Sequence, residues 1–254
     1  MPTQIVKYNE LDFTQSVEQF ESTFPKRINM MAVPKRHGGL VQEVPVNDPR
    51  RVSLKGKIQE IDATTCRSVI DSFEKEFGLF NKKFRLWDDR YVFAYPLGFN
   101  YAFVPGTNMA SALYTVDFMC ADPFWYYDTT GSSSRTLNSA DTFVSSGIYK
   151  EAFTLNNVGN VFVYPTITVT ASGTLTTIIV RNLTTGRNFT YTGTVTSGTS
   201  LVVSCSNFTV TNNGTEDLTN WSGSFLWLDP GNNSMEVQGS ITATYAMTWG
   251  PRTY

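Results

Sequence analysis

Apolar and polar residues alternate with a period of two in several segments of the first half of the chain. In residues 51–58, Val52, Leu54, Gly56 and Ile58 alternate with charged and hydroxyl-bearing side chains. Because successive side chains of a strand point to opposite faces, this pattern predicts a half-buried strand. Further strands are predicted over residues 84–87, 91–95 and 113–119.

Residues 63–77 follow a helical period instead. Cys66, Val69, Ile70, Phe73 and Phe77 recur at spacings of one, three and four, and charged residues occupy other positions of the turn. An apolar stripe of this kind is typical of a helix that packs one face on a sheet. The first half is therefore predicted to combine a sheet with one amphipathic helix.

The second half has the pattern of an all-β domain. Short runs rich in threonine, valine and aromatic residues are separated by turn signals that contain glycine, asparagine or proline. Closely spaced short strands of this type indicate a sandwich or a jelly-roll-like domain. The predicted strands are residues 167–170, 177–180, 189–191, 201–204, 208–211, 225–228, 235–238 and 241–245.

The composition changes near residue 128. Residues 1–128 contain 15 Lys and Arg and 16 Asp and Glu residues, whereas residues 129–254 contain 5 and 6. The polar stretch DTTGSSSR begins at residue 128, and stretches of this composition commonly join domains. We therefore expect a first domain over residues 1–128, a linker over 129–150 and a second domain over 151–254.

Charge and composition exclude several classes of protein. The formal net charge is -2, whereas a protein that coats nucleic acid carries a basic surplus. No apolar run resembles a signal peptide or approaches the roughly 20 residues of a membrane span, so we expect no membrane anchor. The three cysteines are too few and too far apart for a disulfide framework, which favours synthesis in a reducing cytoplasm.

Candidate catalytic chemistry is sparse. His37 is the single histidine, and a Ser/His/Asp or Cys/His catalytic unit would have to use it. One histidine and three scattered cysteines cannot supply an ordinary zinc site. Asp88, Asp89 and Asp122 could serve in glycoside hydrolysis, which needs two carboxylates, although Asp88 and Asp89 equally fit a polar turn. We expect a protein that is not an enzyme and needs no cofactor or metal.

Two basic clusters have candidate roles in contacts. The first lies at the expected tip of a hairpin, where its cations could touch a neighbouring subunit or DNA and its glycines permit a tight turn. A solvated loop tip is the alternative. This cluster consists of Lys35, Arg36, His37, Gly38 and Gly39. The second cluster, Lys82, Lys83 and Arg85, is expected at a solvated strand edge.

Aromatic residues of the second half are candidates for exposed contacts. Aromatic faces on a β-sandwich can stack on sugars, but large aromatic side chains also dominate buried cores. Trp227 favours burial because it lies in the apolar run FLWL, and Trp221 fits either role. We take Trp221 and Tyr191 as the candidates for contact with a glycan or a partner. The other aromatic residues of this group are Tyr245 and Trp249.

An ordered set of local strings resembles siphophage distal tail proteins. In the first half these strings are FPKR at 24–27, VPKRHGG at 33–39, NDPRRVSLKG at 47–56 and VDFMCADPFWY at 116–126. In the second half they are NNVGN at 156–160, YPTITV at 164–169, WLDPGNN at 227–233 and MTW at 247–249. The resemblance extends over nearly the whole chain.

The resemblance implies a mainly β fold with two parts. The N-terminal part would be a tail-tube-like β-sandwich with one flanking helix and an extended hairpin. The C-terminal part would be a β-sandwich similar to galectins or carbohydrate-binding modules. Sugar binding does not follow from such a fold, because function resides in sites and not in folds.

The same resemblance implies a structural role in the virion. The family forms a homohexameric ring, a hub of the baseplate or tail tip that joins the tube of a non-contractile tail to the host-adsorption apparatus. Expected partners are a second copy of the chain, the tail-tube protein, a tail-tip or tail-associated protein and a receptor-binding protein. A host surface saccharide is a further candidate, and DNA would be only a passing cargo.

Two alternatives remain open at the level of the sequence. The first is a major tail-tube protein with an appended β-sandwich domain, which would polymerise into tubes. The second is a glycan-binding adhesin that recognises the host surface directly. A discrete ring in electron micrographs would favour the hub, and binding to a glycan array would favour the adhesin.

Overall fold

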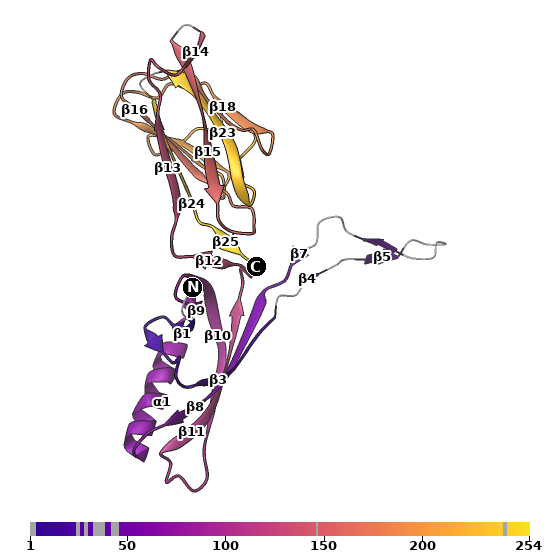
Figure 1. Cartoon of the computed structure of the whole chain (residues 1–254), viewed down its shortest axis with the longest axis vertical. Helices are drawn as coiled ribbons and strands as arrows, with labels where there is room; N and C mark the ends of the chain where they lie inside the picture. The colour runs from indigo at the N-terminus through magenta and orange to yellow at the C-terminus, as the bar shows by residue number, and fades with distance from the viewer. Residues whose placement is uncertain are drawn as a thin grey trace. The chain divides into compact units, whose positions relative to one another are not determined.

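The computed structural model describes residues 4–23, 26–27, 30–32, 39–41, 46–145, 147–240 and 243–254, and side-chain environments for 5–23, 48–145, 147–240 and 243–254. It divides into two compact units, Met1–Asp128 with Tyr254, and Thr129–Thr253 (Figure 1). One helix and many strands make up the described elements, so the mainly β fold class predicted from the sequence is confirmed.

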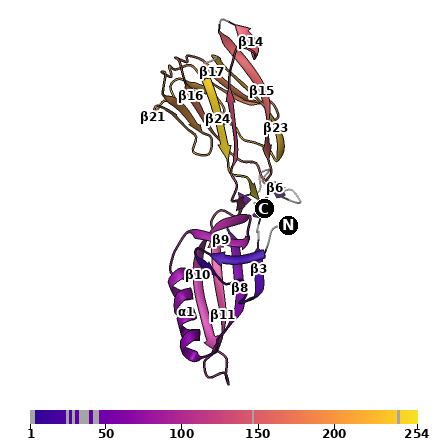
Figure 2. The same cartoon turned by 60° about the vertical axis from the view of Figure 1, so that its left-hand side comes forward.

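The first unit is an antiparallel sheet with the strand order β2-β1-β9-β10-β11-β8-β3, and β12 lies beside β10. The long neighbours β8, β10 and β11 form its centre (Figure 2). The strands are β1 Gln4–Tyr8, β2 Leu11–Asp12, β3 Val17–Thr23, β8 Arg50–Gln59, β9 Lys82–Trp87, β10 Arg90–Phe103, β11 Ser111–Cys120 and β12 Trp125–Tyr127.

Helix α1 spans Ala63–Phe77, in agreement with the predicted limits. Asp62 caps its N-terminus, where the carboxylate accepts a hydrogen bond from the backbone N–H of Thr65 at 2.8 Å and satisfies one of the free donors of the first turn. The buried residues of the helix are Cys66, Ile70, Phe73 and Phe77. Their spacing places them on one side of the helix, where they join the core of the sheet.

Phe73 lies at the centre of an aromatic cluster between α1 and the sheet. Its ring centroid is 5.4 Å from that of Tyr114, 5.7 Å from Phe77, 5.9 Å from Phe99 and 6.0 Å from Phe13. Tilted and edge-on contacts at these distances are favourable for aromatic pairs. Tilted and edge-on rings therefore attach the helix to the sheet.

The β3–β8 ladder continues into a long hairpin. Phe20 pairs with Leu54, and the ladder proceeds through β4 Lys26–Arg27 with β7 Val46–Asn47 to β5 Met30–Ala32 with β6 Gly39–Val41. Along this path, the register between the two paired arms of the hairpin changes by at most a few residues. In the described part of the chain, β4–β7 and β5–β6 are separate two-stranded sheets, so the hairpin extends beyond the sheet from which it starts.

The second unit contains two antiparallel sheets, β13-β24-β16-β19-β20-β21 and β14-β15-β23-β17-β18-β22. Buried side chains of both sheets form one core, in which aliphatic residues surround Phe189, Tyr191 and Tyr245. The strands are β13 Gly131–Thr136, β14 Thr142–Ser145, β15 Ile148–Asn157, β16 Thr166–Ala171, β17 Ile178–Asn182, β18 Arg187–Tyr191, β19 Ser200–Ser204, β20 Thr209–Asn212, β21 Thr215–Glu216, β22 Trp221–Gly223, β23 Gly231–Ser240 and β24 Ala243–Trp249; β25 is Arg252–Thr253.

The linker expected over residues 129–150 is wrong. β13 pairs with β24 from Gly131↔Trp249 to Thr136↔Thr244, and β14 pairs with the start of β15. The polar composition misled the prediction because an edge strand is held by backbone hydrogen bonds and can leave serine and threonine side chains in water. Leu137 supplies the buried anchor that follows β13.

Two smaller predictions also need correction. Residues 225–228 do not form a strand, because Leu228 makes a single bridge with Val163 while Leu226 and Leu228 turn inward. Lys82, Lys83 and Arg85 are not on a sheet edge, since β9 pairs with both β1 and β10.

Replacement of Phe73 by alanine should destabilise the first unit by about 3–5 kcal/mol, because it removes a buried ring from a packed cluster. Phe73 is 4% exposed, whereas Phe80 is 66% exposed, so Phe80→Ala is the matched control. Chemical denaturation followed by tryptophan fluorescence measures both. Equal midpoints for the two variants would show that the cluster does not support the unit.

Replacement of Gly131 by alanine should destabilise the second unit by about 1–3 kcal/mol through overpacking. A Cβ atom on Gly131 would lie 2.1 Å from the ring of Trp249, which is itself buried. Thermal unfolding compares this variant with Ser132→Ala, a change at the neighbouring exposed position of the same strand. Wild-type stability for Gly131→Ala would mean that residues 131–136 do not belong to the sandwich.

Candidate functional site

The predicted hairpin tip falls largely outside the described residues. Lys35, Arg36, His37 and Gly38 lie there, and Gly39 is the first residue of β6, where it pairs with Ala32. In the sequence the first four of these residues lie between the paired strands β5 and β6. The role of the tip in subunit contact therefore stays a prediction.

The first unit has an open face, which we define as the side chains of β8, β10 and β11 that alternate with the buried ones. Along β11, Tyr114, Val116 and Phe118 are buried, whereas Leu113 and Asp117, which point to the other side, are exposed. Phe93, Tyr95, Leu97 and Leu113 are exposed apolar members of this face, and Arg51 and Lys55 are exposed charged members. The open face is thus a mixed apolar and charged surface on a rigid sheet.

The carboxylates considered for glycoside hydrolysis have local structural partners. Asp89 accepts hydrogen bonds from the Arg90 guanidinium at 3.0 Å, and this bond holds the pKa of Asp89 below its usual range. Asp122 accepts from the hydroxyl of Tyr126 and from the backbone N–H of Phe124. Both carboxylates therefore stabilise turns beside β10 and β12.

The second basic cluster belongs to a similar local network. Arg85 donates two hydrogen bonds to Asp128, one of them at 2.9 Å, and the pKa of Asp128 is lowered chiefly by these bonds. Lys83 lies 3.9 Å from the ring centroid of Tyr91 and also faces Asp128. These cations join the end of β12 to the adjacent strands.

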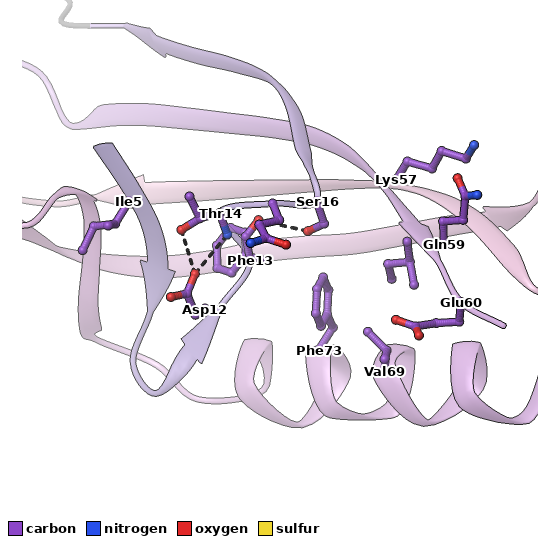
Figure 3. Close-up of a pocket in the computed structure, with 12 residues that line it drawn as sticks. Ile5, Asp12, Phe13, Thr14, Ser16, Lys57, Gln59, Glu60, Val69 and Phe73 are labelled. Atoms are coloured by element: carbon purple, nitrogen blue, oxygen red, sulfur yellow. Dashed lines mark hydrogen bonds between the residues drawn. The ribbon is translucent and has the colours of Figure 1, made fainter. Parts of the chain in front are cut away.

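A cleft of about 630 Å³ lies between the β2–β3 turn, the end of β8 and helix α1 (Figure 3). Phe13, Ile58 and Phe73 supply apolar walls. At its rim, Thr14 donates to Asp12 at 2.7 Å, and the Ser16 hydroxyl donates to the carbonyl of Phe13 at 3.0 Å. The polar groups of the turn are therefore engaged with one another and do not converge on a ligand.

Neither a membrane-spanning helix nor a metal-binding cluster is found among the described residues. No helix in that part of the chain is long and apolar enough to cross a membrane. Within the same residues, no cluster of three or more His, Cys, Asp or Glu side chains is arranged to hold a metal ion.

Tyr191 is not an exposed contact residue. Its ring is 0% exposed in the core of the second unit, and burial raises the pKa of its hydroxyl to about 12. The hydroxyl donates to Asp217 at 2.6 Å and accepts from the amide of Asn212 at 2.9 Å. The candidate assignment of Tyr191 to glycan contact is wrong, because inward alternation on β18 places the ring between the sheets.

The tryptophans are less accessible than expected for sugar platforms. Trp221 is half-buried, and its ring stacks on Phe225 at 4.5 Å with Phe189 further along at 6.5 Å. The guanidinium of Arg187 lies 3.4 Å from the ring centroid of Trp227. Trp249 is buried. Neither Trp221 nor Trp227 thus presents two free faces.

Sequence reasoning missed the exposed phenylalanines of the second unit. Phe162 and Phe208 are both exposed, and each contacts Tyr164, at 5.6 Å and 6.0 Å respectively. The signal was present, since Phe208 follows Ser206 and Asn207 in a turn where a large apolar side chain is unexpected.

Replacement of Tyr191 by phenylalanine should raise the pKa of Asp217 toward its usual value, because the tyrosine hydroxyl is the main group that lowers it. Stability from this bond is present above the unfolded pKa of Asp217 and is lost as pH falls through its folded pKa. NMR titration of the side-chain carboxyl carbon measures the shift, with Tyr149→Phe as the control. An unchanged pKa in Tyr191→Phe would contradict the assigned hydrogen bond.

Comparisons with known proteins agree with the resemblance seen in the sequence. Residues 158–252 match the family model SPP1_Dit, described as the siphovirus-type tail component, C-terminal domain. No curated protein sequence matches the chain significantly.

A solved structure with the same fold covers nearly the whole chain. The SPP1 Dit protein (gp 19.1), described as a paradigm of the hub adsorption apparatus in phages that infect Gram-positive bacteria, matches with a TM-score of 0.71 and 13% identity. The match covers 98% of this chain and 99% of that one, which establishes the fold. The second unit thus matches the C-terminal domain of siphovirus-type tail components, and the predicted resemblance of the chain to distal tail proteins is confirmed.

Proposed function

We propose that the chain is the structural hub of a non-contractile phage tail tip and forms a closed ring of six. In this role it joins the tail tube to the host-adsorption apparatus and lets DNA pass through the ring. It would reside in the virion after synthesis and assembly in the host cytoplasm. The fold shared with a hub protein supports this proposal.

The observation that carries the proposal is the hairpin that leaves its own sheet. In the described part of the chain, β4–β7 and β5–β6 pair as isolated two-stranded ladders. A hairpin with only two strands is marginally stable in water, and it needs a third strand or a packing surface. A neighbouring subunit can supply that surface, and a closed ring supplies it to every copy.

The open face of the first unit supports the same conclusion. Its exposed members Phe93, Leu97 and Leu113 lie on rigid, long strands instead of mobile loops. A ring would cover part of this exposed apolar surface. The near balance of 15 basic and 16 acidic residues in the first 128 residues also suits a channel that passes DNA without holding it.

The partners proposed for the hub are the tail-tube protein, a tail-tip or tail-associated protein and a receptor-binding protein. Repetition by symmetry makes weak contacts sufficient for such docking. Linked binding sites can raise avidity by roughly 10²–10⁴ without any new contact.

Shortening the hairpin should abolish the ring while both units stay folded. Replacing residues 28–45 with Asn-Gly closes the β4–β7 ladder at the Arg27↔Val46 pair, and Asn-Gly is the favoured two-residue hairpin turn. Native mass spectrometry and electron microscopy should show rings for the wild type and monomers for the variant. Unaltered unfolding of the variant would serve as the folding control.

A second variant keeps the hairpin and replaces Lys35 and Arg36 with serine. We expect weaker assembly at low salt and little change at high salt, because exposed charges are screened. Long tubes formed by the wild-type chain would favour a tail-tube protein. Rings of unchanged stability from the shortened variant would refute the role of the hairpin.

A further inference from the structure

Six aromatic rings on the second unit form one continuous surface, which we call the aromatic ridge. Each ring contacts the next, with centroid distances between 4.5 and 6.3 Å. The order of contact is Trp227, Phe162, Tyr164, Phe208, Phe225 and Trp221. Phe208 is 54% and Phe162 is 43% exposed, and the others are half-buried. Contiguous exposed apolar surface of this kind marks an interaction site.

Three buried asparagines hold the segments that carry the ridge. Asn182 donates to the carbonyl of Trp227 at 2.7 Å, and Asn157 donates to the carbonyls of Val161 and Leu228. Asn233 donates to the carbonyl of Asp229 and accepts from its N–H. These amides hold the segments 158–165 and 224–230 where regular strand pairing is absent, so the part of the ridge that these segments carry is preformed.

Phe208, a member of the ridge, has an unfavourable backbone conformation. Its φ angle is 56°, in the left-handed region that large side chains rarely adopt. The backbone there turns a phenylalanine ring outward, against Tyr164 and Phe225. A strained residue that exposes an apolar ring points to a function at that ring and not to stability.

The ridge carries a cation without a carboxylate partner. The Arg187 guanidinium lies on Trp227 and donates to the carbonyl of Phe225 at 3.1 Å. Among the described residues, no carboxylate lies within ion-pair distance of Arg187. Asp229 instead accepts a hydrogen bond from the indole N–H of Trp227 at 3.1 Å.

Two features favour a protein partner over a sugar. Phe225 covers one face of Trp221 and Arg187 covers one face of Trp227, so neither indole can be sandwiched between two sugar rings. The exposed rings are phenylalanines, which offer no hydrogen bonds to hydroxyl groups. Apolar side chains next to carboxylates would complement both the rings and the free charge of Arg187.

We propose that the aromatic ridge docks a protein segment that presents apolar side chains beside acidic ones. Arg187 selects the acidic residues, and Phe208 with Phe162 receives the apolar ones. The site lies within the second unit and does not depend on ring formation, so its test can fail or succeed independently of the hub.

Two fluorescein-labelled peptides, identical in their phenylalanine and leucine residues, test the proposal with the full chain. One carries aspartates between the apolar residues, and the other carries lysines at the same positions. Fluorescence anisotropy should show tighter binding of the aspartate peptide. Phe208→Asn should weaken that binding about tenfold without loss of thermal stability, because asparagine tolerates a positive φ. Arg187→Gln should remove the preference between the peptides.

Phe143→Ser is the matched control, because Phe143 is exposed on β14 outside the ridge and its loss should leave binding unchanged. Absence of peptide binding, equal binding of both peptides, or full binding by Phe208→Asn would each overturn the proposal. A chitohexaose probe is titrated in parallel. If it binds and Phe208→Asn abolishes that binding while the peptides do not bind, the ridge is a sugar platform and the proposal is wrong.

Discussion

Ten consecutive residue pairs join β8 to β11, from Arg50↔Cys120 to Gln59↔Ser111. The ladder has no bulge, so the period of two is preserved on both strands and every second side chain faces α1. Tyr114 and Phe118 then meet the rings of the helix. The same register commits the alternate residues to the open face. A one-residue slip would exchange the two sets, which makes this ladder the constraint on which the first unit depends.

The second unit depends on a different constraint. Its two sheets bury both inner faces and leave long connections at their ends. There the backbone cannot pair with a neighbouring strand along its full length, and buried polar groups need partners. Asn157, Asn182 and Asn233 meet that need with side-chain amides. Each amide both donates and accepts, so it holds backbone groups of these connections in place, and the connections can display aromatic residues.

Features that depend on the local hydrophobic period could be predicted from the sequence. Features that depend on contacts between distant segments could not. The limits of α1 and the alternation of β8 followed from spacing alone. β10 was predicted too short, because Pro96 suggests a strand end, whereas a bulge between Pro96 and Gly98 lets the ladder continue. Tyr191 was misplaced for a similar reason. An aromatic side chain on a strand fits both an exposed face and a core, and only the opposite sheet explains the burial of Tyr191.

Binding by this chain has to rely on shape more than on charge. The last 126 residues contain only 5 basic and 6 acidic side chains, so long-range steering toward a partner is weak. Specificity must then come from the few places where geometry is fixed. A hairpin offers backbone pairing and fixed direction, and the aromatic ridge offers apolar contact together with the charge of Arg187. Each contact of these two kinds has a modest affinity by itself. Repetition around a symmetric assembly would raise the overall affinity.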